Sequence, residues 1–181
     1  MHNQDTYTGA SFSLKNRLGR LCWNLVYLIF FRYSPRPLHA WRAFLLQLFG
    51  ATIGKGVHVY PKVKIWAPWN LVVHDEVGVA DGVDLYCQGK ITLGYRSIIS
   101  QRSYICTGTH DFTHKGHPLY TKDIVISPYA WVAAEAFIGP GVTIADGAVV
   151  GARAAVFKNV GAWEVVGGNP AKFIKKREMQ L

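Results

Sequence analysis

Three of the chain's seven histidines lie with an aspartate in one short stretch, ICTGTHDFTHKGHPLY, residues 105–120. His110, Asp111, His114 and His117 fall within eight consecutive positions. An imidazole titrates near neutral pH, so it can take a proton from a hydroxyl or, when neutral, bind a metal ion. The stretch therefore predicts a general base, a metal site or a polar surface loop, and the surrounding elements distinguish these alternatives.

The residues on both sides of this stretch repeat with a period of six. Aliphatic side chains occupy every sixth position in four series: Ile53, Val59 and Ile65; Val73, Val79 and Leu85; Leu93, Ile99 and Ile105; and Ile126, Val132, Ile138, Ile144, Val150 and Val156. This period is neither the 3.6 of a helix nor the 2 of a two-faced sheet. It fits a coil with three flat faces, in which each hexapeptide forms a short strand and a corner and directs its aliphatic residue inward.

Three hexapeptides make one coil, and the interruptions of the repeat respect this unit. The predicted coils of 18 residues cover 53–70, 73–90, 93–110, 126–143 and 144–161. The interruptions at 71–72, 91–92 and 111–125 each follow a whole coil, so they emerge at one corner. In a solenoid, insertions on one face often mark the binding face. We predict an all-β solenoid, a parallel β-helix of about five coils over residues 51–162, with 111–125 as an inserted loop.

Residues 1–50 lack the repeat and are predicted to form an N-terminal helical cap. SLKNRLGRLCWNLVYLIFFR is typical of one helix, and SPRPLHAWRAFLLQLFG of a second that Ser34 and Pro35 can open and Gly50 can close. Such a cap would cover the strand edges at the end of the solenoid. The apolar run at 21–31 is too short to span a hydrocarbon core of about 30 Å.

The charge distribution constrains the partners. Twenty Lys and Arg against eleven Asp and Glu give a net charge of +9, which favours anionic partners. Residues 1–50 contain six Lys or Arg and one Asp, a net +5, which suits a helix lying on an anionic membrane surface; packing against its own domain or a neighbouring subunit is the alternative. The C-terminal tail, 163–181, is also basic, with four Lys or Arg against two Glu, and no nucleic-acid partner is predicted because no recognised module appears.

The cysteines indicate the compartment. Cys22, Cys87 and Cys106 are an odd number without metal-ligand spacing, and no signal cleavage site follows the apolar run. No disulfide framework is implied. We therefore predict a cytoplasmic protein, with peripheral contact on the inner membrane face if the first helix binds lipid.

Four stretches carry a resemblance to a known family: KGVHVYPKVKIWAPWNL, ISQRSYICTGTHDF, IGPGVTIADGAVVGARAAVFKNV and VVGGNPAKFIKKR. Over roughly residues 51–177 the chain resembles the hexapeptide-repeat acyltransferases, and among them the colanic-acid or exopolysaccharide O-acetyltransferases. The resemblance implies a left-handed β-helix, whereas the general crossover rule alone would favour a right-handed one. It also implies a homotrimer that binds acetyl-CoA in a groove between two subunits.

The resemblance assigns roles within and below the histidine stretch. His110 matches the general base, which takes the acceptor's proton as the hydroxyl attacks the thioester carbonyl. Asp111 is a candidate to orient the imidazole, and His114 to contact the acceptor sugar. Relatives often carry asparagine where Cys87 stands, and that amide is a candidate donor to the oxyanion. Because cysteine donates weakly, Tyr86, Gln88 or backbone amides are alternative donors.

Small and basic residues further along match positions that hold the acyl donor. The resemblance places Trp131 against the pantetheine arm, with Ala134 and Ala152 beside it; corner packing is the alternative role for both alanines. Lysine ammonium groups attract phosphates, so lysines near the C-terminus are candidates to bind the nucleotide of the donor. The alternative role of these lysines is to form a generic basic tail. The lysines assigned to the phosphates of the nucleotide are Lys158, Lys172 and Lys175.

The predicted function is acetyl-CoA-dependent O-acetylation of a sugar hydroxyl in exopolysaccharide, capsule or lipid-linked glycan synthesis. N-acetylation of an amino sugar on a nucleotide carrier is the alternative within this class. Two alternatives belong to other functional classes. One is a metal-dependent enzyme like the gamma-class carbonic anhydrases, which are also left-handed β-helices, and the other is a catalytically silent scaffold. No metal ligand is assigned, because three of the four candidate ligands lie in one irregular loop rather than on flat faces of stacked coils.

Overall fold

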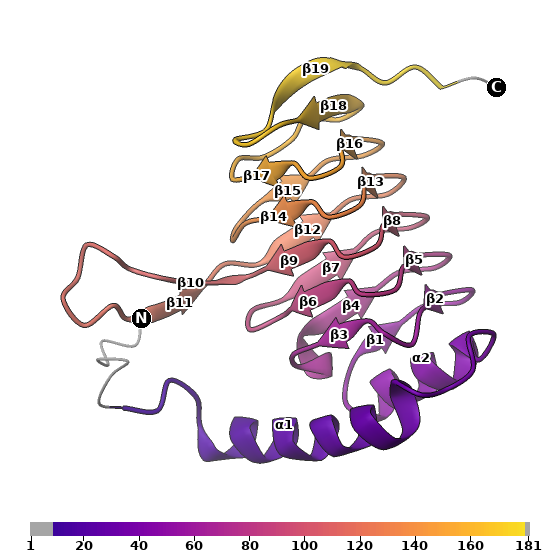
Figure 1. Ribbon diagram of the computed structural model, residues 1–181, viewed down its shortest axis with the longest axis vertical. Helices are drawn as coiled ribbons and strands as arrows, with labels where there is room; N and C mark the ends of the chain where they lie inside the picture. Colours follow the sequence, from indigo (N-terminus) through magenta and orange to yellow (C-terminus); the bar gives the residue numbers. More distant parts are fainter. Residues whose placement is uncertain (1–8, 180–181) are drawn as a thin grey trace.

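The computed structural model describes residues 9–179, which form a triangular column of stacked coils on a base of helices (Figure 1). Sheet A contains β1 (Thr52–Ile53), β4 (Leu71–Val73), β7 (Ile91–Leu93), β12 (Ile124–Ile126) and β15 (Thr143–Ile144). Sheet B contains β2 (His58–Val59), β5 (Gly78–Val79), β8 (Ile98–Ile99), β13 (Trp131–Val132), β16 (Val149–Val150), β18 (Glu164–Gly167) and β19 (Lys172–Lys176). Sheet C contains β3 (Lys64–Ile65), β6 (Asp84–Tyr86), β9 (Tyr104–Cys106), β14 (Phe137–Ile138) and β17 (Ala155–Val156). Residues 1–8 of the predicted cap and 180–181 of the predicted tail lie outside this description.

The sixfold aliphatic pattern forms the interior of the column. Equivalent residues stack in register, as Ile53 pairs with Val73 and Val73 with Leu93 in sheet A. Every aliphatic residue of the predicted series is at most 8% exposed. Burying one such side chain contributes about 1.5–3 kcal/mol, so this interior is the main source of stability.

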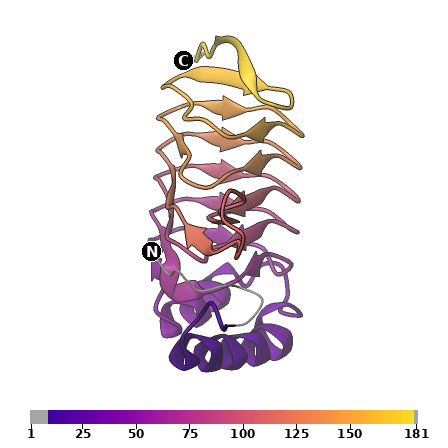
Figure 2. The ribbon, with the colours of Figure 1, turned by 90° about the vertical axis from the view of Figure 1, so that its left-hand side faces the viewer.

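The winding of the coils is left-handed. In Figure 1 the chain runs from left to right along sheet A at the back and from right to left along sheet C at the front, while it climbs. Figure 2 shows the same coils from the side as a straight stack, with the helices at one end. The predicted left-handed parallel β-helix is confirmed, against the usual hand of parallel crossovers.

The stack extends one partial coil beyond the predicted five. Val160 bridges to Ile144, and β18 pairs in parallel with β16, which places Val166 over Val150. β19 then turns back antiparallel to β18 and ends sheet B. The sixfold pattern misses this coil because the spacing from Val156 to Val160 is four residues, so residues expected in a basic tail form strands instead.

The corners between strands are tight. Gly82 turns with a φ of 78°, but Glu76 and Arg96 adopt φ values of 59° and 54° although both carry side chains. Arg96 lies one coil above Glu76, and its Nε is 2.6 Å from the Glu76 carboxylate. Gly94 permits two backbone segments to approach closely: a Cβ there would lie 2.6 Å from the backbone nitrogen of Pro128, so no other residue fits without a shift.

The N-terminal segment is helical, as predicted, but its second helix starts late. α1 (Leu14–Val26) continues into the π-helix η1 (Tyr27–Phe31), and α2 (His39–Leu48) follows; the 3₁₀-helix η2 (Pro68–Asn70) lies at a corner of the column. The predicted start at Ser34 and Pro35 is instead a turn held by Arg42. Its guanidinium donates to the Ser34 hydroxyl at 2.7 Å and to the Pro35 carbonyl at 2.9 Å.

Two buried side chains fix the helices to the first coil. Trp23 of α1 donates from Nε1 to the Ile65 carbonyl at 2.7 Å, and Arg42 of α2 donates from Nε to the Val59 carbonyl at 2.7 Å. Both side chains are fully buried, and burial lowers the pKa of Arg42. The helices thereby cover the end of the column, where bare coil faces would otherwise meet solvent. Over residues 9–179, none of the helices has the length and apolar character needed to cross a membrane.

Candidate active site

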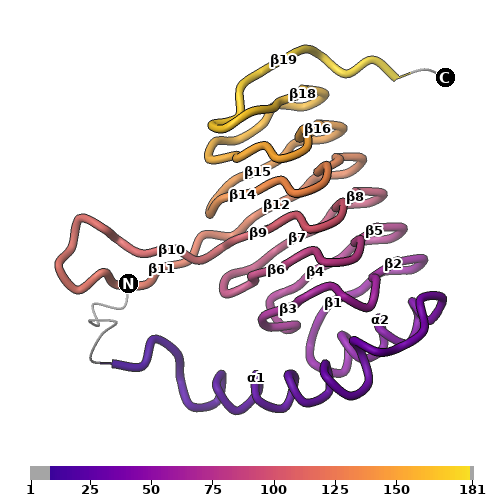
Figure 3. Tube along the Cα trace, viewed as in Figure 1, coloured from indigo at the N-terminus to yellow at the C-terminus, as the bar shows by residue number. Residues whose placement is uncertain are grey.

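Most of the predicted inserted loop, 111–125, forms a hairpin arm that begins earlier, at Gly108, and projects from one corner of the column (Figure 3). β10 (Gly108–His110) pairs antiparallel with β11 (Leu119–Thr121), so that His110 lies opposite Leu119. The arm leaves after β9 in sheet C and returns into β12 in sheet A. Because the arm is a paired extension of rigid strands, it holds His110 at a defined place outside the column.

The hydrogen bond that His110 makes fixes which ring nitrogen can act. Its side chain is exposed, and Nδ1 lies 2.7 Å from the backbone carbonyl oxygen of His117. A carbonyl oxygen can only accept, so Nδ1 carries the proton when the ring is neutral. Nε2 is then left with a free lone pair, which is the state that a general base requires.

Asp111 is used differently from the predicted role. Its Oδ1 accepts hydrogen bonds from the Thr113 hydroxyl at 2.6 Å and from the Thr113 backbone N–H at 2.9 Å, and the hydroxyl bond is the main reason that the pKa of Asp111 is lowered. The carboxylate thus stabilises the turn of the arm, while the His117 carbonyl holds the imidazole. His114 is exposed, and its Nδ1 accepts from the Gly116 N–H at 3.1 Å.

The other predicted acceptor contacts lie one coil below the arm. Tyr86, at the end of β6, pairs in register with Cys106 of β9 and is half-buried. The Gln88 amide donates from Nε2 to the Tyr86 hydroxyl at 2.8 Å, and its buried Oε1 has no hydrogen-bond partner within the described chain. A Cβ on Gly108 would collide with the Gln88 Oε1, so this side chain lies against the base of the arm.

The predicted contact of Cys87 with a substrate is corrected by its burial. The side chain is fully buried, its thiol donates to the Ala67 carbonyl at 3.2 Å, and the Ala67 N–H lies 3.3 Å from Sγ. Burial raises the pKa of this thiol to about 11. Cys87 is therefore a neutral packing residue, and it cannot donate to an oxyanion at the surface.

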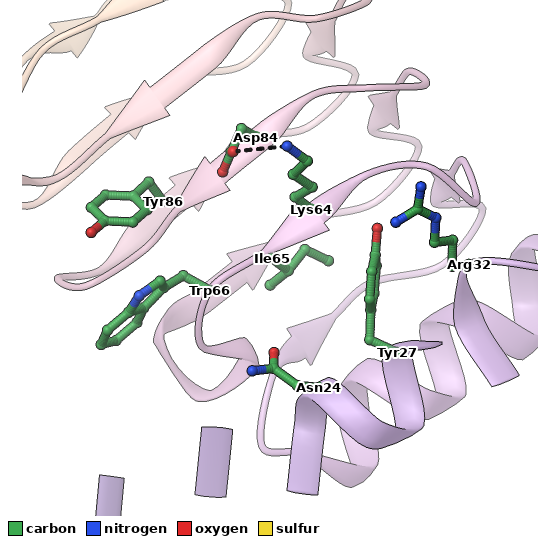
Figure 4. Close-up of a pocket in the computed structure, with 8 residues that line it drawn as sticks. All are labelled: Asn24, Tyr27, Arg32, Lys64, Ile65, Trp66, Asp84 and Tyr86. Atoms are coloured by element: carbon green, nitrogen blue, oxygen red, sulfur yellow. Dashed lines mark ion pairs between the residues drawn. The ribbon is translucent and has the colours of Figure 1, made fainter. Parts of the chain in front are cut away.

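A pocket of about 290 Å³ opens beside Tyr86, between the helical base and sheet C (Figure 4). Its lining combines two strands with the first helical segment: Asn24, Tyr27, Arg32, Lys64, Ile65, Trp66, Asp84 and Tyr86. Burial raises the pKa of Asp84, and Lys64, at 4.0 Å, opposes that shift. Aromatic rings beside charged and amide groups suit a polar ring such as a sugar.

Sequence reasoning found only Tyr86 of this pocket. Asn24 gave the one usable signal, because it is the single polar residue in the apolar run at 21–31. The helical segment meets Trp66 only in the folded chain, where Arg20 also stacks 4.2 Å from that ring. No spacing along the sequence predicts such a contact.

Among the predicted donor residues, Trp131 lies on the opposite side of the column from the hairpin arm. Trp131 lies on the outer face of β13, is 43% exposed, and donates from Nε1 to the Ser100 hydroxyl at 2.9 Å. It lines a groove of about 450 Å³ with Ile98, Tyr129 and Arg177. In Figure 1 β13 and β16 lie on the right and the arm on the left, so one chain does not bring Trp131 to His110.

The remaining donor candidates are spread over the same column. Ala134 and Ala152 lie at the corner between sheets B and C, after β13 and β16. Lys172 and Lys175 are exposed on β19, above Trp131 in sheet B. Lys158 is exposed at the corner between sheets C and A, on the same edge as the arm. The predicted donor residues other than Lys158 thus lie away from the edge that carries the arm and His110.

Known proteins share this sequence and this column. The chain is 50% identical over 155 residues to WcaF of Escherichia coli strain K12, a proposed colanic acid biosynthesis acetyltransferase, and the match covers 86% of this chain and 85% of that protein. The chain belongs to the hexapeptide-repeat acetyltransferases. The galactoside O-acetyltransferase of the same strain is 27% identical over 149 residues, 75% of this chain and 68% of that protein. No family model matches the chain.

The solved structures agree with this acetyltransferase fold. A hexapeptide-repeat acetyltransferase of Vibrio cholerae, crystallised with acetyl coenzyme A, superposes with a TM-score of 0.85 at 22% identity, over 94% of this chain and 93% of that one. The predicted family, fold and enzyme class are therefore confirmed. Residues 9–179 contain no group of three His, Cys, Asp or Glu side chains placed to hold a metal ion.

Proposed function

We propose that this enzyme transfers the acetyl group of acetyl-CoA to a sugar hydroxyl, with His110 as the general base. The supporting observation is the 2.7 Å contact of Nδ1 with the His117 carbonyl, which leaves Nε2 free to accept a proton. The acceptor oxygen attacks the thioester carbonyl carbon while Nε2 takes the hydroxyl proton. The tetrahedral adduct then expels the coenzyme A thiolate, which takes the proton from the imidazolium, so the products are an acetyl ester and free coenzyme A.

Acetyl-CoA as the donor fits the residues of sheet B. Lys172 and Lys175 are exposed above Trp131, whose ring offers an apolar surface to the pantetheine arm. Ala134 and Ala152 present small side chains at the adjacent corner, so a thin chain can approach the backbone closely. Lysine ammonium groups complement the phosphates of the nucleotide.

The division of the site between two edges supports a homotrimer. His110 and Lys158 lie at the corner between sheets C and A, whereas Trp131 lies on sheet B. In a ring of copies packed side by side, the arm of one copy meets sheet B of the next, and each groove then contains both His110 and Trp131. A monomer is accordingly expected to be inactive.

The acceptor is proposed to be a sugar of a lipid-linked glycan or exopolysaccharide repeat unit, bound beside Tyr86. The pocket of Asp84, Trp66 and Asn24 lies on the same sheet as the strand that leads into the arm. The protein would then act in the cytoplasm, in peripheral contact with the inner membrane face, where such carriers are assembled. A nucleotide-linked amino sugar is the alternative acceptor.

Transfer to defined acceptors tests the proposal. Purified protein is incubated with acetyl-CoA and with free sugars, nucleotide-linked amino sugars or lipid-linked saccharides, and released coenzyme A and acetylated product are measured. We expect a product that mild alkali deacetylates, because esters are hydrolysed where amides survive. An alkali-stable product would support the N-acetyl alternative. Coenzyme A release that is equal for wild type and His110→Ala would overturn the role of the base.

A further inference from the structure

The helical base carries many exposed apolar side chains that the fold does not bury. Four leucines of α1, Leu14, Leu18, Leu21 and Leu25, are 67%, 53%, 57% and 53% exposed. At 3.6 residues per turn they lie within about 40° of the direction opposite to Trp23. Since Trp23 points into the column and donates to the Ile65 carbonyl, the leucines point away from it along its long axis.

The rest of the base extends this apolar surface. Among the large hydrophobic side chains that are exposed between residues 9 and 179, twelve of 23 fall within residues 14–48. The eight beyond the leucines of α1 are Leu28, Ile29, Phe30, Tyr33, Leu38, Trp41, Phe44 and Leu48. Such a concentration on one end of a protein marks an interaction site. We call these twelve side chains the basal face.

We propose that the basal face docks the enzyme on the surface of an anionic lipid bilayer, with the column standing away from it. This deepens the proposed function, because it states how the enzyme reaches a lipid-linked acceptor. An amphipathic helix binds this way when its apolar side enters the headgroup boundary and its basic side chains meet lipid phosphates. Trp41 and Tyr33 are the residue types that favour that boundary.

The charges around the basal face complement an anionic surface. Residues 9–50 contain six Lys or Arg and no Asp or Glu, although Arg42 is buried and Arg20 stacks on the Trp66 ring. Lys15 and Arg17 flank the leucine stripe, on its two sides, at about 60° and 40° from its edges on the helix. Both are exposed, whereas Arg36 beside α2 pairs with Asp81 of the column at 3.4 Å and is not counted with them. A basic side chain near an anionic surface contributes about 1 kcal/mol each, and the long stems can follow the apolar face while the charges meet phosphate.

A lipid surface fits this face better than a second copy does. Copies that pack side by side to complete the active site would use the flanks of the column, whereas the leucine stripe points along the axis. Two copies placed base to base would bring two acid-free cationic rims together, and like charges facing each other oppose association. An anionic bilayer can bury the leucine stripe in its headgroup boundary and place lipid phosphates beside the basic side chains that flank the stripe.

The base is rigid enough to set the height of the active site. Trp41 links the helices by donating from Nε1 to the Phe30 carbonyl at 3.0 Å, while Trp23 and Arg42 fix them to the first coil. The arm leaves the third coil, so one helix of about 10 Å and two coil spacings of about 4.8 Å put it roughly 20 Å above the bilayer contact. The acceptor hydroxyl is then a saccharide position beyond the headgroup, not the sugar nearest the lipid.

Vesicle binding by the full-length protein tests the proposal. Wild type, the triple variant Leu18→Gln, Leu21→Gln, Leu25→Gln, and a control triple Phe173→Gln, Ile174→Gln, Met179→Gln are sedimented with vesicles of phosphatidylcholine alone or mixed with phosphatidylglycerol. The control residues are matched in exposure, at 56%, 62% and 55%, but lie at the opposite end of the chain. Glutamine keeps the helix, because its helix propensity is close to that of leucine.

We expect wild type and the control triple to bind the anionic vesicles, and the leucine triple to bind at least tenfold more weakly. Lys15→Gln with Arg17→Gln should weaken binding about thirtyfold and reduce its dependence on salt. Wild type that ignores anionic vesicles, or a leucine triple that binds as wild type does, would overturn the proposal. A dimer that forms without lipid and is lost in the leucine triple would also overturn it, by assigning the face to a second copy. His110→Ala should bind vesicles normally, which separates this test from that of the proposed chemistry.

Discussion

Replacing His110 by asparagine separates its chemistry from its structural role. In asparagine the side-chain Nδ2–H can take the place of Nδ1–H and donate to the His117 carbonyl, so the bond of 2.7 Å has a substitute. Nothing replaces Nε2. The arm should therefore keep its shape and stability, while the hydroxyl proton loses its acceptor.

The expected loss is the contribution of a general base, about 10²- to 10⁴-fold in kcat, or roughly 2.7–5.4 kcal/mol of barrier. The assay follows coenzyme A release at saturating acetyl-CoA, with thermal unfolding measured in parallel. His110→Ala should show the same loss of rate, should be less stable than His110→Asn by about 0.5–1.5 kcal/mol at most because one exposed hydrogen bond is gone, and should be partly rescued by added imidazole. A rate for His110→Asn within a few-fold of wild type would refute the assignment of the base.

Three further outcomes follow from buried or basic side chains. The pKa of the Cys87 thiol, about 11, exceeds the ordinary 9.0, so the neutral thiol favours the folded state below pH 9. That contribution to the free energy of unfolding is lost as the pH rises towards 11, by up to about 1.4 kcal/mol per pH unit. Urea unfolding at pH 8 and 10 should show this loss in wild type but not in Cys87→Ala, whose KM for the acceptor should be unchanged. Ser97 and Ser103 are both fully buried, but only Ser103 has a partner, the Ala133 carbonyl at 2.9 Å, whereas the Ser97 hydroxyl has none within the described chain. Ser103→Ala should lower the free energy of unfolding by about 1 kcal/mol and Ser97→Ala should leave it equal or higher, and the opposite order would contradict the hydrogen-bond assignment. Lys172→Gln with Lys175→Gln should raise the KM for acetyl-CoA while kcat changes little, and an unchanged KM would remove both lysines from the donor site.

The interior of the column could be predicted from the sequence because each coil repeats one local rule. An inward aliphatic residue every six positions specifies three short strands per turn, and residues such as Ile99 need no distant information to be placed. Val166 was not predicted to be buried, because the spacing of inward residues falls from six to four between Val156 and Val160, before the chain reaches it. The handedness of the coil could not be predicted from the repeat either, because left-handed and right-handed coils show the same sixfold pattern of inward residues. Only the resemblance to a family distinguished the two.

The candidate site could be predicted where it depends on the phase of the sixfold repeat, and could not be predicted where it depends on contacts between distant segments. Because every interruption follows a complete coil, the inserted loop had to leave at the corner that also ends β6, and the arm leaves there, but His110 lies on β10 of the arm and not at the end of the coil. The group that holds its ring could not be found in the same way. The carbonyl of His117 is a backbone atom of no distinctive residue type, and it reaches Nδ1 only because the arm folds as a hairpin that brings two segments seven residues apart together.

The residues that carry the proposed functions lie mostly outside the sixfold repeat. The solenoid interior is satisfied by its own repeat, so the residues outside the repeat are free to vary, and they hold the arm, the pocket and the basal face. Asn24 and Leu25 are neighbours on α1, yet one lines the pocket beside Tyr86 and the other faces away from the column. One helix therefore connects acceptor binding to the proposed lipid contact. A substitution such as Leu25→Gln should reduce vesicle binding without altering transfer to a soluble acceptor, whereas Asn24→Leu should do the reverse; a variant of either residue that changed both readouts equally would show that the two faces do not act independently.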